Sequence, residues 1–433
     1  MDKFIAFLEN NLSTPMAKLS EQKHLRAIRD GVVSALPFII FGSLFLIIAF
    51  PPVPADSAVG VWAAKHAADI LIPYRLTMYM MTVYITFGIG YSLSQSYKLD
   101  PLSGALLAGS AFLFTTGVQM IDKVGFVLPM ANMGGHGLFV GMITSIFAVE
   151  VLRFCKTKNI TIKMPASVPS SVARSFEALI PVTVVLTVMT LITVVFKVDT
   201  HSLVDKAVAP LISAGDSLPG VLVPVFLITF FWAFGIHGVS VVGAVARPVW
   251  EVYIANNSAA VAAGKVGSQL PHIAPETFFQ WFIWIGGSGA TLGLVIAMLI
   301  AGKSSYSKAL GRTTIIPSIF NINEPVIFGM PIVLNPVLII PFMIVPIIGA
   351  TVAYLATAAG LVNPTYVTVP WTLPAPIGAY LSTGGDWRAI ILVVINLTIS
   401  VVIYLPFFKM YDKKLLAQES ATIEIDKDVK MSV

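Results

Sequence analysis

The sequence predicts an all-α polytopic membrane protein, with about 10 transmembrane helices, several re-entrant hairpins and two halves of different function. Two observations predict this class. Of the 433 residues, 56% are hydrophobic and only 11% are charged, whereas a soluble domain carries about 25% charged residues. Apolar runs of about 20 residues also recur along the chain, and an α-helix of that length crosses a bilayer.

Nine segments are long and apolar enough to be spans, and they are 31–50, 77–96, 102–120, 135–155, 174–196, 221–245, 279–301, 332–359 and 388–408. Two weaker apolar pieces, 314–330 and 366–383, are short and interrupted by proline and glycine. Such interruptions are typical of hairpins that enter the membrane and return.

The two ends of the chain are polar and charged. Residues 1–30 place apolar side chains among charges, which predicts an amphipathic segment at the membrane interface. Residues 411–433 predict a flexible tail. Lysine and arginine are concentrated in the first 30 residues, in the loop 156–173 and after residue 408, so we expect both termini to be cytoplasmic. The same distribution explains the net charge of +5 without nucleic-acid binding.

The spans differ between the two halves. Those in 31–197 are regular, which predicts a scaffold half, and 198–220 is polar enough to be a connector. Segments in 221–410 are interrupted and hold most of the polar groups at membrane depth, which predicts a substrate-binding transport half. Cys155, the only cysteine, excludes an internal disulfide, and the six dispersed histidines predict no metal site. The sequence contains no glycine-rich phosphate loop, so we expect no cofactor.

The most informative segment is Asn321-Ile322-Asn323-Glu324-Pro325, a polar group inside a long apolar stretch. A carboxylate at membrane depth costs about 2.5 to 3.5 kcal/mol on insertion scales, so it is rarely without function. Pro325 disfavours a helical conformation at Glu324 and predicts an extended one. Irregular backbone at this depth is found only where it is buried in protein or lines a cavity, and we expect these polar groups to point into a cavity. Many amide groups with little net charge suit a neutral polyhydroxy solute.

A second polar group, His237, lies between glycines in Phe230-Phe231-Trp232-Ala233-Phe234-Gly235-Ile236-His237-Gly238. The glycines permit a helix break, and the imidazole can both donate and accept. An alternative is a histidine bonded to a carbonyl at the break. For Glu324 the alternatives are a partner arginine or a helix-end carboxylate. No arginine lies within the clear spans of this half.

Four motifs together carry a resemblance to a family. They are Gly134-Gly135-His136-Gly137-Leu138-Phe139, the run from Lys163-Met164-Pro165 to Ser175-Phe176, the Gly-Ile-His-Gly sequence at 235–238, and Asn321-x-Asn323-Glu324-Pro325 with the apolar residues that follow. In this order they resemble the IIC component of sugar phosphotransferase systems, in the lactose, cellobiose and diacetylchitobiose family. The resemblance covers nearly the whole chain.

The resemblance implies a bacterial plasma-membrane permease that works as a homodimer through its N-terminal half. It implies that His237 and Glu324 contact a β-linked disaccharide, with diacetylchitobiose and cellobiose as first choices, and that Asn323 and Asn321 add hydrogen bonds. It also implies phosphorylation of the sugar by IIB, a phosphocysteine protein supplied in turn by IIA. Because Cys155 lies at the end of a span, IIB is expected to be a separate polypeptide and the chain itself not to be an enzyme.

A pyranose ring offers hydroxyl edges and apolar faces, so one of the five tryptophans of the C-terminal half is expected to stack on the sugar. They are Trp250, Trp281, Trp284, Trp371 and Trp387, and Trp387 is our choice, with Asn335 as a weaker polar candidate.

Two alternative functions stay open: a proton-coupled sugar transporter with a Glu324–His237 relay, and, less favoured, a membrane enzyme on lipid-linked glycans. Against the enzyme, Glu324 has no second acid nearby, whereas glycosidic chemistry normally uses a pair of carboxylic residues.

Overall fold

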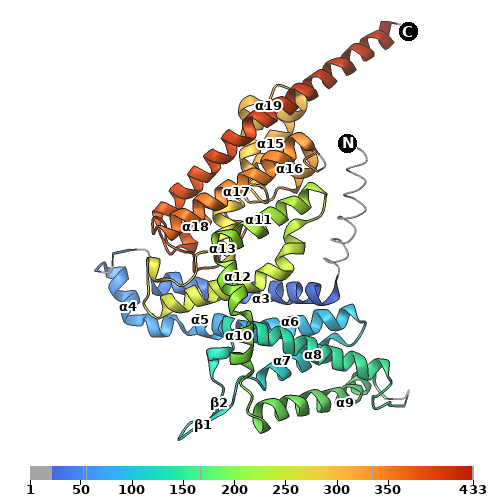
Figure 1. Ribbon diagram of the computed structural model, residues 1–433, viewed down its shortest axis with the longest axis vertical. Helices are drawn as coiled ribbons and strands as arrows, with labels where there is room; N and C mark the ends of the chain where they lie inside the picture. Colours follow the sequence, from blue (N-terminus) through green and yellow to red (C-terminus); the bar gives the residue numbers. More distant parts are fainter. Residues whose placement is uncertain (1–21, 52, 55, 166–167, 334, 432–433) are drawn as a thin grey trace. The chain divides into compact units, whose positions relative to one another are not determined.

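The structure is a computed structural model that describes residues 22–51, 53–54, 56–165, 168–333 and 335–431. These residues form two compact units (Figure 1). In the described residues, the N-terminal unit comprises 22–214 and 243–264, and the C-terminal unit comprises 215–242 and 265–431. Helix α12 therefore begins in the C-terminal unit and continues in the N-terminal one. Residues 1–21 of the expected amphipathic segment 1–30 lie outside the described residues, and 23–30 form the start of the first described helix.

The N-terminal unit is built from helices and one small sheet. Its elements are α3 (Lys23–Ala49), α4 (Ala58–Ile70), α5 (Ile72–Thr77), η2 (Met78–Met80), α6 (Met81–Ser96), α7 (Pro101–Leu113), β1 (Gln119–Ile121), β2 (Gly125–Val127), η3 (Met130–Asn132), η4 (Gly135–Gly137), α8 (Leu138–Thr157), α9 (Ser170–Thr190), η5 (Leu191–Val195) and α10 (Thr200–Gly215). β1 and β2 pair antiparallel, with Met120 opposite Phe126. Helix α6 packs against α3, α7 and α8.

Small residues allow the helices of this unit to approach closely. A Cβ at Gly90 on α6 would lie 2.5 Å from the carbonyl oxygen of Gly104 on α7, so neither position has room for a side chain.

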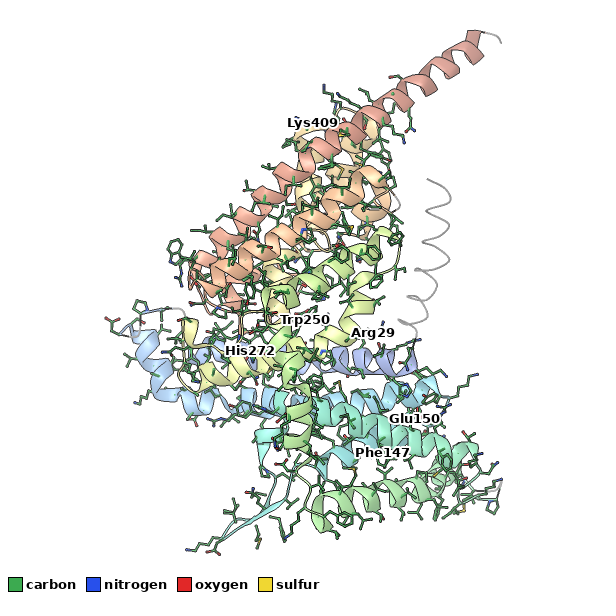
Figure 2. All side chains as sticks on the ribbon, viewed as in Figure 1. Arg29, Phe147, Glu150, Trp250, His272 and Lys409 are labelled. Carbon is green, nitrogen blue, oxygen red and sulfur yellow. The ribbon has the colours of Figure 1, made fainter. Side chains whose placement is uncertain are left out.

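Polar side chains also join helices of this unit. The carboxylate of Glu150 on α8 accepts from the Tyr97 hydroxyl (2.6 Å) and contacts Nε2 of His24 on α3 at 2.8 Å. Figure 2 shows Glu150 on its helix.

The C-terminal unit is more interrupted. Its elements are α11 (Leu218–Ala233), the start of α12 (Gly238–Ala262), η6 (Gly267–Gln269), α13 (Glu276–Phe278), η7 (Phe279–Ile283), α14 (Leu292–Ala301), α15 (Ser305–Ile319), α16 (Glu324–Gly329), α17 (Pro336–Ala358), α18 (Ala375–Ser382) and α19 (Trp387–Met431). Helices α17 and α14 both pack against α19, and α11 packs against α17. The loop before α13 is anchored by Asp216, whose carboxylate accepts from the main-chain N–H groups of Ile273 and Ala274 and contacts His272 (Figure 2).

The expected class, an all-α polytopic membrane protein, is confirmed. Among the described residues, seven helices are long and apolar enough to cross a membrane, or eight if the bent pair α10 and α11 is one span. Two shorter apolar helices, α7 and α14, add to these. The expected number of about 10 is reached only when the bent pair and the two short helices are all counted.

Several boundaries differ from those expected. The segment 102–120 is helical only to Leu113 and then leads into the β-hairpin. The segment 279–301 begins as a π-helical turn, opens at Trp284 and resumes as helix at Leu292. The connector 198–220 holds helix α10.

The C-terminal end also differs from expectation. We expected residues 411–433 to be a flexible tail, but α19 continues to Met431. Its side chains supply a reason, because Asp412 accepts from the main-chain N–H of Lys303 and Glu419 accepts from those of Ser305 and Tyr306. These bonds satisfy N–H groups before and within the first turn of α15 that have no partner inside that helix. The extension of α19 is thereby tied to the rest of the unit.

Candidate functional site

The chain breaks between α11 and α12, within Phe234 to His237. Gly235 has φ +76°, a conformation in which side chains are disfavoured. A Cβ at Gly238 would lie 2.0 Å from the carbonyl oxygen of Ile228 on α11, so the start of α12 rests directly on the preceding helix. Both glycines are therefore needed to make the break. The expected single span 221–245 is wrong for this reason.

His237 caps the N-terminus of α12. Its Nδ1 accepts the main-chain N–H of Ser240 at 3.3 Å and lies 3.0 Å from the Ser240 hydroxyl. Because a main-chain N–H can only donate, Nδ1 acts as the acceptor and a neutral imidazole carries its proton on Nε2. The side chain is exposed, and its ring packs 4.6 Å from that of Trp232. The imidazole is thus held at the start of α12 and against the ring of Trp232.

Glu324 is the first residue of α16, a short helix that follows a tight turn. Asn321 forms that turn with φ +62°, and Asn323 precedes the helix. The expected extended conformation at Glu324 is wrong, since Pro325 occupies the first turn of the helix, where a missing N–H costs nothing. The Glu324 side chain is exposed. The carboxylate therefore stands at the surface of the unit, at the positive end of a helix.

The two asparagines hold this turn in place. The Asn321 amide oxygen accepts from Gly286 N–H (3.0 Å), and its amide nitrogen donates to the carbonyl oxygens of Trp371 and Leu373 (2.9 Å each). Asn323 donates to the Ser288 carbonyl at 2.7 Å. Both side chains are buried. These bonds join three irregular segments and hold the turn that precedes Glu324.

The two breaks lie next to each other in the C-terminal unit. The ring of Trp232, which packs on His237, is 6.3 Å from that of Phe328 on α16. A Cβ at Gly235 would also lie 3.3 Å from the side chain of Val333, just after α16. The two breaks that carry His237 and Glu324 therefore lie side by side, with the buried ring of Trp232 between His237 and Phe328 of α16.

The remaining predicted residues lie in different places. Asn335 caps α17, with its amide oxygen accepting from the N–H of Val337 at 3.0 Å. Trp387 begins α19 with 64% of its surface exposed. Beside it, the Arg388 guanidinium donates to Asp386, whose carboxylate also accepts from Asn363 N–H. Burial alone would raise the pKa of Asp386, but these bonds hold the pKa below its usual range. Asp386 thus remains charged and fixes the loop that carries Trp387.

Sequence reasoning did not connect Trp371 with the polar turn. Its carbonyl oxygen accepts from Asn321 and, at 3.5 Å, from the Gln280 amide, while 52% of its surface is exposed. In contrast, Trp281 and Trp284 are buried in this unit. A second missed feature is the run Gly286-Gly287-Ser288-Gly289, whose three glycines all have positive φ. The repeated glycines within an apolar segment are the sequence signal that could have predicted this break.

Comparison with known proteins places the chain in a family. A family model described as "Phosphotransferase system, EIIC" matches residues 29–346. The chain belongs to this family. It is therefore a membrane permease component of a bacterial sugar phosphotransferase system, and the resemblance drawn from the four motifs is confirmed.

Relatives align along almost the whole chain. The cellobiose-specific EIIC component of Geobacillus stearothermophilus is 41% identical over 97% of this chain and 97% of that protein. The lactose-specific EIICB component of Staphylococcus aureus (strain N315) is 33% identical over 100% of this chain and 76% of that protein. Among solved structures, the chain matches the transporter ChbC, the IIC component from the N,N'-diacetylchitobiose-specific phosphotransferase system. The TM-score is 0.89 at 41% identity, and the match covers 96% of this chain and 99% of that one.

Proposed function

We propose that this permease binds and translocates a β-linked disaccharide of the cellobiose or diacetylchitobiose class. The observation that carries the proposal is the pairing of two exposed polar side chains, His237 and Glu324, at neighbouring helix breaks joined through aromatic rings. The substrate class is supported by the names of the relatives that align over nearly the whole chain.

In this proposal the sugar is held at its edges and on one face. The Glu324 carboxylate accepts from hydroxyl groups, and Nε2 of His237 donates to a hydroxyl oxygen. We assign the stacking surface to Trp371 in place of Trp387. Trp371 is exposed and is bonded through its main chain to Asn321, in the same turn as Glu324, whereas Trp387 is fixed by the separate Asp386–Arg388 group.

We further propose that a separate IIB protein phosphorylates the sugar at the cytoplasmic face. The only cysteine, Cys155, is buried in α8 of the N-terminal unit and is unsuited to carry a phosphoryl group to the sugar. We expect the N-terminal unit to form a homodimer and the C-terminal unit to move against it during alternating access. Both termini are expected to face the cytoplasm.

The first prediction tests the two ligands directly. Glu324→Gln should weaken disaccharide binding roughly tenfold or more, because a hydrogen bond to a charged group contributes about 1.5 to 3 kcal/mol. His237→Ala should weaken it less, roughly threefold to tenfold, because a hydrogen bond from a neutral imidazole contributes about 0.5 to 1.5 kcal/mol. Isothermal titration of the purified protein with cellobiose and diacetylchitobiose measures this.

A matched control is available for the histidine. His66 packs on Trp62 with ring centroids 5.4 Å apart, much as His237 packs on Trp232, but it lies in the N-terminal unit. His66→Ala should therefore bind sugar like the parent. Folded variants at 237 and 324 with parental affinity would move the sugar site elsewhere.

A further inference from the structure

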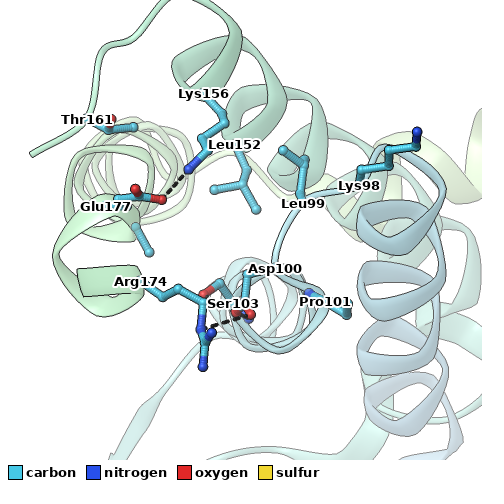
Figure 3. Close-up of a pocket in the computed structure, with 11 residues that line it drawn as sticks. Lys98, Leu99, Asp100, Pro101, Ser103, Leu152, Lys156, Thr161, Arg174 and Glu177 are labelled. Atoms are coloured by element: carbon cyan, nitrogen blue, oxygen red, sulfur yellow. Dashed lines mark hydrogen bonds and ion pairs between the residues drawn. The ribbon is translucent and has the colours of Figure 1, made fainter. Parts of the chain in front are cut away.

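The N-terminal unit contains a cleft of about 310 Å³ that is separate from the proposed sugar site (Figure 3). Four helix ends meet there: the end of α6, the start of α7, the end of α8 and the start of α9. These helices belong to the membrane-crossing part of the unit, so their ends lie near the level of lipid headgroups. The cleft has an apolar wall made by Leu99, Pro101 and Leu152.

Two ion pairs border the cleft. Lys156 on α8 pairs with Glu177 on α9, and Arg174 on α9 lies 3.5 Å from Asp100 before α7. Figure 3 shows these four side chains around the cleft and Lys98 turned away from it. Burial alone would raise the pKa of Asp100, but hydrogen bonds from Ser103 and the charge of Arg174 lower it, so the carboxylate is charged at neutral pH.

Each pair is partly open to solvent. The side chains of Lys156 and Arg174 are 50% and 52% exposed, and those of Glu177 and Asp100 are 34% and 29% exposed. Exposed pairs of this kind contribute little to stability. The side chains of Lys156, Glu177 and Arg174 can therefore turn toward a ligand, whereas Asp100 is held through Oδ2 by Ser103 and offers its Oδ1.

The arrangement selects a particular ligand chemistry. A simple anion would meet the carboxylates of Asp100 and Glu177, and a simple cation would meet Lys156 and Arg174. A zwitterion satisfies both pairs. The helices that border the cleft also expose apolar side chains, which are Leu102 and Leu106 on α7 and Phe176 and Leu179 on α9. Apolar residues beside a charged cleft suit an amphiphile.

We propose that this cleft binds the phosphoethanolamine headgroup of a membrane phospholipid. The phosphate contacts Lys156 and Arg174, the primary ammonium donates to Asp100 and Glu177, and the acyl chains lie along α7 and α9. A choline headgroup has no N–H to donate, and a glycerol headgroup has no cation, so both fit this cleft less well.

The test is a competition between headgroups. The full chain is incubated in detergent with equal amounts of phosphatidylethanolamine, phosphatidylcholine and phosphatidylglycerol of identical acyl chains, and retained lipids are counted by native mass spectrometry. Phosphatidylethanolamine should be retained roughly tenfold over each of the others, as expected for hydrogen bonds to charged groups. Equal retention of phosphatidylcholine, or preference for phosphatidylglycerol, would overturn the proposal.

Variants locate the preference in the cleft. Asp100→Asn removes the charge but keeps the cap of α7, because asparagine caps helices as well as aspartate. This variant and Glu177→Gln should each reduce the phosphatidylethanolamine signal toward that of phosphatidylcholine. Asp122→Asn, at the turn between β1 and β2, and Lys158→Gln, two residues beyond Lys156 and not lining the cleft, should leave the preference unchanged. A preference that survives both cleft variants contradicts the assignment.

A competition with a water-soluble headgroup distinguishes binding of the whole phospholipid from binding of the headgroup alone. Glycerophosphoethanolamine at the same concentration should not displace the bound phospholipid, because it lacks the chains that contact α7 and α9. Complete displacement at equal concentration would contradict the lipid assignment in favour of a soluble zwitterion. The result is independent of sugar binding, since every residue involved lies in the N-terminal unit.

Discussion

At the scale of single residues, two polar side chains stand where helices begin. His237 caps α12 and packs on the ring of Trp232, Glu324 opens α16, and both side chains are exposed. Helix beginnings leave main-chain N–H groups without partners in the helix, so they suit polar contacts in an apolar setting. The chemistry proposed for the sugar rests on these two groups.

The aromatic assignment gives the second residue-scale test. Trp371→Ala should weaken disaccharide binding roughly tenfold or more, since truncating an anchoring aromatic contact costs about 2 kcal/mol. Trp387→Ala is the matched control, because Trp387 is also exposed, at 64% against 52% for Trp371, but begins α19. Titration of both variants with cellobiose compares them. A loss confined to Trp387→Ala would reverse the assignment.

Sequence alone singled out His237 and Glu324 as candidates because each is a polar residue in an apolar run. Among the five tryptophans it led to Trp387, whereas the proposal of Trp371 rests on the Asn321–Trp371 bond, which joins residues 50 positions apart. The sequence marked Asn321 and Asn323 as polar groups within an apolar stretch, at membrane depth. Only the structure shows that their amides bond to the main chain of neighbouring segments.

At the scale of elements, the breaks in the helices decide the shape of the C-terminal unit. Glycines make the breaks at 234–237 and 284–291, by positive φ at Gly235, Gly286, Gly287 and Gly289 and by close packing at Gly238. Hydropathy finds apolar segments well, so α3, α8 and α17 were predicted near their true positions. It does not mark where an apolar run bends, which is why 102–120, 221–245 and 279–301 were drawn too long.

The break before α12 can be tested by one substitution and its control. Gly238→Ala should lower the unfolding free energy by about 1 to 3 kcal/mol, because the added methyl group overlaps the Ile228 carbonyl. At Gly349 on α17 the nearest atoms to an added Cβ are 3.6 Å away, so Gly349→Ala should be tolerated. Thermal unfolding in detergent compares the two. If both alanine variants unfold like the parent, α12 does not rest on α11 as described.

At the scale of the whole molecule, the chain divides into two units with different interiors. The N-terminal unit is formed by long helices that pack closely through glycines such as Gly90 and Gly104. The C-terminal unit joins its irregular segments by side chains that bond to main-chain groups, as Asn321 and Asn323 do. This difference supports, as a proposal, a stable scaffold beside a unit that binds and moves the sugar.

We propose that the permease delivers a β-linked disaccharide to a phosphorylated IIB protein. The most direct measurement is uptake of labelled cellobiose or diacetylchitobiose into vesicles that contain the purified chain, with phosphorylated IIB of the cellobiose class enclosed. We predict that sugar phosphate accumulates inside, that a protonophore leaves uptake unchanged, that omitting phosphorylated IIB abolishes uptake, and that Glu324→Gln reduces it strongly at sugar concentrations below the parental Kd. Accumulation of free sugar without IIB, lost on addition of a protonophore, would contradict the account and indicate a proton-coupled transporter.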